Sequence, residues 1–426
     1  MFDVLVVGGG AAGFFAAINI CENSPNLNVA ILERGKEVLT KVKVSGGGRC
    51  NVTHAEFMPS ELVKNYPRGE KELLGPFHTF CSGDIVAFFE KRGIALKIEE
   101  DGRMFPTTNS SQTIIDCFLN EVKRLGITVL KNSSVVDIAP SELKENPSGW
   151  RVQSYKKAYE TKKLLVATGS NTKIWKIMED LGHTIEPPVP SLFTFNITDD
   201  RIKGIQGVST NARVLVKPKI FNNSKILVSL KSQLPKTPIL ESEGPLLITH
   251  WGMSGPAILK LSAWGAQILN GYKYHFKIRV NWIPEYHIGG VLPLLMEIKE
   301  VETKKTVLRT NAVELPKRLW INLVKASGIA DSTKWADVSK NQLQKLADQL
   351  TKSEFSVEGK STFKEEFVTA GGVDLKEINF KTFESKIHPN LYFAGEVINV
   401  DAITGGFNFQ NAWTGGYIAA KAIASF

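Results

Sequence analysis

Residues 45–51, SGGGRCN, combine three consecutive glycines with Arg49, Cys50 and Asn51. Glycines let the main chain approach a ligand closely, and a guanidinium and an amide supply donors for phosphate or carbonyl oxygens. A catalytic Cys50 would need a partner base or a second cysteine, and the sequence shows neither, so we expect this thiol to pack beside the bound group. Upstream, Lys41 can neutralise phosphate charge, although a solvated loop is an equal alternative there.

A second glycine-rich segment, VVGGGAAG, places Gly8, Gly10 and Gly13 in the Gly-x-Gly-x-x-Gly spacing. In this spacing the glycines give a tight turn, close approach to a pyrophosphate, and close packing of the following helix on the strand. The N-terminus of that helix offers free N–H groups to the phosphates. Glu33 lies twenty residues after Gly13, where an acidic side chain accepts hydrogen bonds from ribose hydroxyls. Together these features predict a dinucleotide site, and the alternative is a glycine-rich turn in an unrelated α/β protein.

Two further predicted strands end next to a glycine. LLVATGS ends at Thr168–Gly169 and LYFAGE ends at Gly395–Glu396. With the first fingerprint, these endings resemble FAD-binding flavoproteins, in which several strand ends converge on one extended FAD. The usual acid near the pyrophosphate in such proteins is aspartate, so Glu396 keeps the carboxylate and changes its reach.

The elements that must position these residues follow from the apolar pattern. Residues 3–7 predict a buried strand, residues 11–22 a helix and NVAILER a second strand, which together open a parallel sheet. Further strands are expected in ITVLKNSSVVDI, GWRVQSY and KKLLVATG.

The middle of the chain has a different pattern. Three prolines in residues 186–195 indicate a boundary. The short segments ARVLVKPKIF, KILVSL, GPLLITHWG and YHFKIRVNW then predict a β-rich region, and residues 312–352 predict amphipathic helices. The last seventy residues return to apolar strands and glycines, so the middle is expected to be an insertion into a sheet completed by the C-terminus.

The composition sets wider limits. The 426 residues exceed one usual core, and 43% hydrophobic with 22% charged residues exclude disordered and fibrous classes. The four cysteines form neither Cys-x-x-Cys nor a zinc spacing, so no disulfide framework and no metal site are expected. We find no apolar run of membrane-spanning length and expect a cytoplasmic protein. The net charge of +9 predicts attraction to anions such as a nucleotide or RNA.

Several segments together resemble the BaiN/RdsA family of FAD-dependent, aminoacetone oxidase-like flavoproteins. They are SGGGRCN, GRMFPTT, THWGMSGPAIL, VTAGGVDLKEI, TFESK and LYFAGEVINVDAITGGFNFQNAWTGG, in that order along nearly the whole chain. The resemblance implies an α/β fold with a Rossmann-like, glutathione-reductase-type FAD domain interrupted by two inserts. The corresponding ranges are 1–190 and 355–426 for the FAD domain, 191–311 for a β-barrel-like insert and 312–354 for a small helical insert.

The resemblance also implies how FAD is held. SGGGRCN would run along the flavin and its ribityl-phosphate arm, and the helix after Gly406 would point its N-terminus at the flavin pyrimidine. Asn408 and Gln410 are the candidates for side-chain hydrogen bonds to the ring, and Val136 would clamp the adenine through its main chain. The implied cofactor-binding residues are Gly8, Gly10, Ala11, Ala12, Gly13, Glu33, Arg34, Lys41, Ser45, Gly46, Gly47, Gly48, Arg49, Cys50, Asn51, Val136, Ala167, Thr168, Gly169, Gly395, Glu396, Gly405, Gly406, Phe407, Asn408 and Gln410.

The expected reaction is hydride transfer from reduced FAD to an activated C=C bond. The family has been linked to steroid-like enones and to a uracil ring of ribosomal RNA, so the expected partner is a small molecule or RNA, with no DNA and no membrane. His250 and Arg103 are the candidates for substrate chemistry; a packed or capping role for His250 is the alternative. No second Gly-x-Gly-x-x-Gly follows a strand after residue 60, so NAD(P)H would bind only transiently near the flavin.

Two other functions fit the same residues. One is a flavin amine or amino-ketone oxidase that passes electrons to oxygen. The other is a non-catalytic RNA-binding protein that contains FAD, although no recognised RNA-binding motif is present. The substrate, the electron donor and the oligomeric state stay open at this point.

Overall fold

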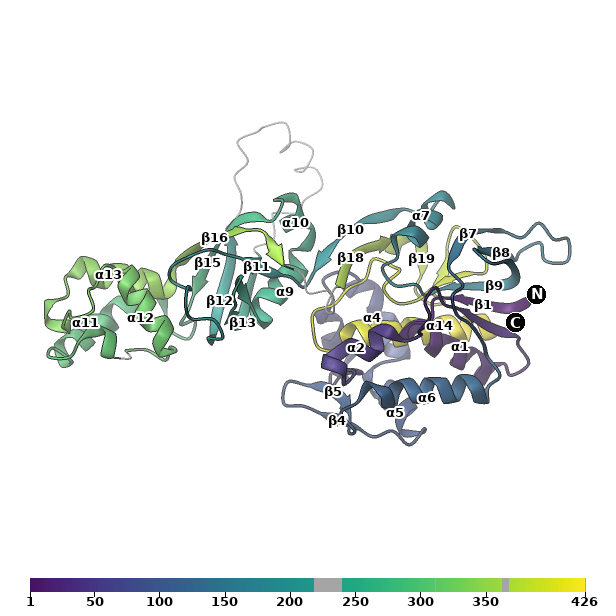
Figure 1. Cartoon of the computed structure of the whole chain (residues 1–426), viewed down its shortest axis with the longest axis horizontal. Coiled ribbons are helices and arrows are strands. Elements are labelled where there is room, and N and C mark those ends of the chain that lie inside the picture. The colour runs from purple at the N-terminus through teal and green to yellow at the C-terminus, as the bar shows by residue number, and fades with distance from the viewer. Residues whose placement is uncertain (218–239, 311, 362–367, 426) are drawn as a thin grey trace, which may run out of the picture. The chain divides into compact units, whose positions relative to one another are not determined.

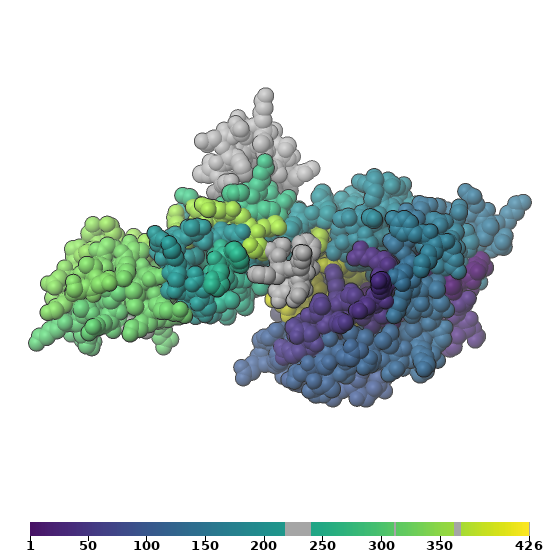
Figure 2. Space-filling model, viewed as in Figure 1, coloured from purple at the N-terminus to yellow at the C-terminus, as the bar shows by residue number. Residues whose placement is uncertain are grey.

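The computed structural model describes residues 1–217, 240–310, 312–361 and 368–425, and the chain divides into two compact units (Figure 1). The first unit comprises Met1–Val189 and Val368–Phe426, and the second comprises Pro190–Phe367. In the space-filling view the first unit mixes purple and blue N-terminal atoms with yellow C-terminal atoms, whereas the second runs from teal to green (Figure 2). The first unit is therefore assembled from both ends of the chain and the second from one continuous stretch.

A parallel sheet forms the centre of the first unit. Its neighbouring strands are, in order, β21 (Leu391–Phe393), β9 (Ala158–Val166), β1 (Phe2–Val7), β2 (Val29–Leu32) and β6 (Thr128–Leu130). Val4 to Val7 of β1 are buried, as expected for a strand covered on both faces. Antiparallel strands extend this sheet, namely β8 (Trp150–Ser154) and β7 (Val135–Pro140) beside β9, and β20 (Glu384–Ser385) and β19 (Ile378–Asn379) beside β21. The strands predicted in this part of the chain are all present.

The first and last helices of the first unit pack against each other (Figure 1). The main chains approach closely, because a Cβ added to Gly416 would lie 3.1 Å from the carbonyl oxygen of Ala12. Phe15 and Trp413 meet edge to face at 5.4 Å between ring centroids in the same buried layer. The helices of this unit are α1 (Ala11–Asn23), α2 (Thr40–Gly48), α3 (Pro59–Leu62), α4 (Glu70–Thr79), α5 (Ser82–Glu90), α6 (Ser111–Arg124), α7 (Thr172–Asp180) and α14 (Phe407–Ala424).

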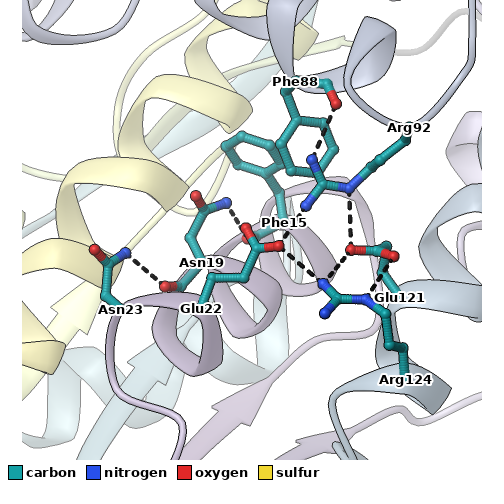
Figure 3. A network of polar contacts seen from close by, with 8 residues as sticks. All are labelled: Phe15, Asn19, Glu22, Asn23, Phe88, Arg92, Glu121 and Arg124. Atoms are coloured by element: carbon teal, nitrogen blue, oxygen red, sulfur yellow. Dashed lines mark hydrogen bonds and ion pairs between the residues drawn. The ribbon is translucent and has the colours of Figure 1, made fainter.

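A network of four charged side chains ties α1 to α6 and to the end of α5 (Figure 3). Arg92 contacts Glu22 at 2.7 Å and Glu121 at 3.1 Å, and Arg124 contacts the same two carboxylates at 3.0 and 2.7 Å. The Arg92 guanidinium also lies 3.6 Å from the centroid of the Phe88 ring. Each cation is shared between two acids, so we infer a structural role for this network.

Two small sheets complete the first unit. β3 (Thr53–His54) and β4 (Leu96–Ile98) both pair antiparallel with β5 (Arg103–Pro106). β10 (Ile185–Ser191) pairs with β18 (Val368–Val373), so the chain passes between the units through neighbouring strands.

The second unit contains an antiparallel sheet and helices around one hydrophobic core. Residue 355, the expected start of the last FAD-domain segment, lies inside β16, whose pairing with β15 places it in this unit instead. The strand order is β16 (Ser353–Glu358), β15 (His275–Asn281), β12 (Ser209–Lys217), β13 (Glu241–Ile248), β14 (Gly252–Ser254), β11 (Thr194–Asn196) and β17 (Lys360–Ser361).

The helical content of the second unit begins earlier than the sequence pattern predicts. Helices α12 (Lys317–Ala326) and α13 (Lys340–Thr351) lie in the expected region, but α9 (Pro256–Trp264), α10 (Ala266–Gly271) and α11 (Val291–Val301) occupy the segment expected to be β-rich. Pro256 at the first turn of α9 is a helix-start signal that the strand interpretation overlooked. The predicted strand KILVSL lies outside the described residues. Among the described helices, none combines the length and apolarity that crossing a membrane requires.

Candidate cofactor site

The first glycine-rich turn has the geometry expected for approach to a phosphate. Gly8 has φ +119°, and a Cβ there would lie 2.3 Å from the carbonyl oxygen of Ala167. A Cβ on Gly13 would lie 2.0 Å from the carbonyl oxygen of Gly8, so this position also excludes a side chain. Gly10 is the N-cap of α1, no side chain caps the helix, and a Cβ on Gly10 would meet no atom within 4 Å. The first N–H groups of α1, those of Ala11 and Ala12, therefore have no side-chain cap, and the space next to Gly10 is open to a ligand.

Glu33 closes the turn from the end of β2. Its Oε2 accepts a hydrogen bond from the main-chain N–H of Gly9 at 2.9 Å, and its Oε1 accepts one from Gly35 at 2.6 Å. Each carboxylate oxygen keeps a further lone pair for a ligand hydroxyl.

A cavity lies beside Glu33 and Gly8. It is also lined by Arg34 and Thr168, which were expected to bind cofactor, and by Asn171 and Ile174. Its wall at the start of β7 is formed by Ser133, Ser134 and Val135 rather than by the expected Val136, which is 38% exposed next to an irregularity in the pairing of β7 with β8.

The residues that follow β9 and β21 lie close to Lys41 of α2. Lys41 and Glu396 form an ion pair, and Glu396 also accepts a hydrogen bond from the N–H of Thr369 at 3.3 Å. A Cβ on Gly169 would lie 3.6 Å from Oε2 of Glu396 and 3.9 Å from Nζ of Lys41. Gly395 faces Ala12 of α1, since a Cβ on it would lie 3.2 Å from the Ala12 methyl group. The structure thus brings Lys41 close to the two predicted strand endings, at Gly169 and at Gly395–Glu396.

The SGGG segment, residues 45–48 at the end of α2, departs from helical geometry. Ser45 is extended, and Gly46, Gly47 and Gly48 have φ of +58°, +68° and +83°. A Cβ on Gly47 would meet no atom within 4 Å, so the main chain here is open to a ligand. The Arg49 guanidinium is already engaged, because it contacts Glu99 at 2.6 Å and lies 4.0 Å from the centroid of the Phe105 ring.

Cys50 is fully buried. Burial raises the pKa of this thiol to about 12, against a smaller opposing effect of a hydrogen bond with Ser45. A protonated, buried thiol is a poor nucleophile, which agrees with the expected packing role.

The start of α14 adjoins the same segment. Gly406 is the N-cap with φ +96°, and no side chain caps the helix. The Asn51 amide, oriented so that both its groups are satisfied, accepts from the N–H of Gly406 and donates to the carbonyl oxygen of Thr53, both at 2.9 Å. Phe407 is buried, and its carbonyl oxygen accepts a hydrogen bond of 2.6 Å from the hydroxyl of Tyr66.

Two amides expected to bind the flavin ring have protein partners instead. Asn408 accepts from the N–H of Ala402 at 3.0 Å and donates to the carbonyl oxygen of the same residue at 3.1 Å. Gln410 is fully buried, accepts from Thr53 at 2.6 Å and donates to Thr414 at 3.1 Å. Both amides therefore hold the loop and helix in place, and their contact with a flavin ring stays a prediction.

The two candidates for substrate chemistry lie in different units. Arg103 contacts Asp101 at 2.7 Å and Glu99 at 3.6 Å, so its charge is already compensated. His250 is exposed on the loop between β13 and β14 of the second unit.

Sequence reasoning missed two features beside the α14 loop. The carboxylate of Asp401 is fully buried and forms a bidentate ion pair with Arg68. His54 lies three residues after Asn51 and contacts Gly405 and Phe407. The spacing of the sequence gave no signal for either contact, because both partners lie more than 300 positions away.

Comparison with known proteins adds relatives of similar length. The family model described as HI0933-like protein Rossmann domain matches residues 2–422. A ribosomal RNA dihydrouridine synthase of Haemophilus influenzae is 28% identical over 431 residues, covering 99% of this chain and 98% of that protein. A 3-dehydro-bile acid delta(4,6)-reductase of Clostridium scindens is 25% identical over 427 residues, covering 98% of each.

Among solved structures, a 3-ketosteroid-delta4-(5alpha)-dehydrogenase from Rhodococcus jostii RHA1 superposes with a TM-score of 0.50. It shares 12% sequence identity, and the match covers 100% of this chain and 97% of that one. At that identity the likeness concerns the fold alone.

Proposed function

The chain belongs to the family of HI0933-like Rossmann-domain proteins, the BaiN/RdsA family that its motifs indicated, and we propose that it is an FAD-dependent reductase of an activated C=C bond. The observation that carries this proposal is the full-length similarity to two relatives whose names both describe saturation of a C=C bond. A ribosomal RNA synthase of dihydrouridine and a bile acid reductase differ in substrate and share that outcome.

The residues of the first unit fit an extended dinucleotide. Gly10 and Gly47 leave open space where a side chain would otherwise stand, and the N-terminus of α1 has no side-chain cap. In this proposal the N–H groups of α1 hold the pyrophosphate, and Glu33 accepts from a ribose hydroxyl. The N-terminus of α14, with Gly405 and Gly406, stabilises negative charge on the ring. When bound, reduced FAD supplies the hydride, and the protein positions the ring and keeps competing water away.

We propose an RNA uracil ring, rather than a small enone, as the substrate, because the net charge lies entirely in the inserted unit. Residues 190–367 contain 25 Lys and Arg against 16 Asp and Glu, a difference of +9, whereas the rest of the chain contains 27 of each. An insert of this charge, joined in one chain to a cofactor domain with no net charge, suits a polyanionic substrate, since phosphate contacts provide affinity without reading sequence.

A reconstituted reaction tests the proposal. Purified protein with FAD, NADH or NADPH and an unmodified ribosomal RNA transcript is expected to add two hydrogens to a uridine, detected by mass spectrometry of the digested RNA. The matched control is Gly10→Asp, which the open space around Gly10 tolerates and which places a carboxylate where the pyrophosphate would bind. No mass gain on RNA, together with saturation of an enone, would favour a small-molecule substrate. Rapid anaerobic flavin reduction by an amine, and none by NAD(P)H, would favour an oxidase.

A further inference from the structure

One peptide unit at the start of α14 has both of its polar groups held by side chains from a single distant segment. The carbonyl oxygen of Gly405 lies 3.1 Å from Nδ1 of His54, and the N–H of Gly406 donates to the Asn51 amide oxygen at 2.9 Å. These two groups belong to the same peptide bond. Asn51 and His54 therefore form hydrogen bonds to the two opposite polar groups of the Gly405–Gly406 peptide.

The contact with Gly405 decides which nitrogen of the His54 ring acts as the donor. A carbonyl oxygen only accepts, so Nδ1 carries the proton of this contact. The ring also stacks on Phe407 with 4.5 Å between centroids and 29° between planes. On its other edge, a Cβ on Gly102 would lie 2.5 Å from Nε2, so the ring occupies space that only a glycine leaves free. The imidazole is thus fixed by its hydrogen bond to Gly405, by stacking on Phe407 and by close packing against Gly102.

The Gly405–Gly406 peptide needs these contacts because two glycines do not by themselves determine its conformation. Gly405 and Gly406 have φ of +133° and +96°, and a pair of glycines samples many other conformations at little cost. A Cβ on Gly406 would lie 2.5 Å from the main chain of Thr53, so the loop also lies directly against β3. Rotation of the peptide would break both side-chain contacts at once.

We propose that His54 is a positioning residue for the ring end of the cofactor. It acts through Nδ1 on the Gly405 carbonyl and sets the direction of the N–H groups at the start of α14. This inference rests on the proposed FAD function. Charged groups near the ring are Arg103, opposite on β5, and Glu99 and Asp101 in the adjoining turn, and Arg103 contacts both acids.

Paired substitutions separate the two ring nitrogens. Asparagine places its amide near Nδ1 and glutamine places it near Nε2, so His54→Asn can keep the contact with Gly405 and His54→Gln cannot. His54→Ala removes both, and His78→Ala, at an exposed position on α4, is the matched control. Readouts are the dissociation constant for FAD added to the apoprotein, the visible spectrum of bound FAD, and its midpoint potential.

We expect His54→Ala and His54→Gln to weaken FAD binding about tenfold and to shift the spectrum and the potential, while His54→Asn stays within about threefold of the wild type. If His54→Ala does not fold, the comparison of Asn with Gln decides alone. Equal behaviour of His54→Ala and His78→Ala, or a better rescue by Gln than by Asn, overturns the inference and leaves the proposed function standing. Wild-type protein that takes up no FAD overturns both.

Discussion

The hydroxyl of Thr53 donates a hydrogen bond of 2.6 Å to Oε1 of Gln410, and this contact joins segments 357 positions apart. Gln410 in turn donates to Thr414 at 3.1 Å, and the Thr414 hydroxyl donates to the carbonyl oxygen of Phe80 at 2.9 Å. Thr53, Gln410 and Thr414 are all fully buried. This chain of hydrogen bonds ties β3 to α14 inside the protein, below the loop that we assign to the cofactor ring.

Replacing Gln410 by leucine should therefore destabilise the apoprotein. The change leaves two buried hydroxyls without their amide partner, which costs about 1–3 kcal/mol in the free energy of unfolding. Urea denaturation of the apoprotein measures it, with Gln112→Leu, at an exposed position of α6, expected to change stability by less than about 0.5 kcal/mol. A Gln410→Leu protein of wild-type stability that no longer binds FAD would instead support direct contact of this side chain with the ring.

Gln410 also shows where sequence reasoning stops. The helix start after Gly406 followed from local glycine chemistry, and the turn at Gly8, Gly10 and Gly13 followed from spacing within one βαβ unit. The partner of an amide depends on which distant segments meet, so Gln410 and Asn408 looked free to bind a ligand. The prediction of strands in the segment of α9 and α11 was wrong, because short apolar runs do not by themselves distinguish strands from helices.

Gly10→Asp should separate folding from cofactor binding. Gly10 has φ −95°, a conformation open to any residue, and no atom lies within 4 Å of an added Cβ. Aspartate is a good N-cap, so α1 should gain a few tenths of a kcal/mol. The same carboxylate would stand at the helix N-terminus and repel the pyrophosphate, and we expect FAD affinity to fall at least about 100-fold.

Thermal unfolding of the apoprotein and a fluorescence titration with FAD provide the two measurements for Gly10→Asp. The control is Gly75→Asp, which also has open space but lies on α4. An unchanged affinity for FAD in Gly10→Asp would remove the pyrophosphate from the start of α1.

The thiol of Cys50 should not react with alkylating reagents in the folded protein. Burial raises its pKa to about 12, so about one molecule in ten thousand carries the thiolate at pH 8. Cys81 is less buried and should react first with a thiol reagent, although burial raises its pKa as well. Peptide mapping after a short pulse of iodoacetamide at pH 8 distinguishes the two. Labelling of Cys50 at the rate of Cys81 in native protein would point to a reactive role.

Buried His183 and Ser385 form, with half-buried Glu377, a chain of hydrogen bonds that has the order of a hydrolytic triad. Nδ1 of His183 lies 3.0 Å from Oε2 of Glu377, and Nε2 lies 3.1 Å from the Ser385 hydroxyl. The Ser385 oxygen also accepts from two main-chain N–H groups, of Ile387 and His388, both at 3.0 Å. An oxygen held by three partners in a buried strand has no free direction for attack on a substrate. We therefore expect the chain to contribute stability that depends on pH.

The direction in which stability changes with pH follows from the pKa of the His183 imidazole. Burial lowers the pKa of His183 below 6.5, against the opposing effect of Glu377. The unfolded state then binds more protons, so this contribution to stability is complete above pH 6.5 and decreases as pH falls below it. His183→Leu should cost about 1–3 kcal/mol in the free energy of unfolding at pH 7.5, because Glu377 and Ser385 lose their hydrogen bonds to the imidazole and keep only main-chain donors. The deficit should shrink toward pH 5.5. Urea denaturation at several pH values measures this, with exposed His78→Leu expected to follow the wild type; a deficit that grew as the pH fell would mean that His183 is charged in the folded protein.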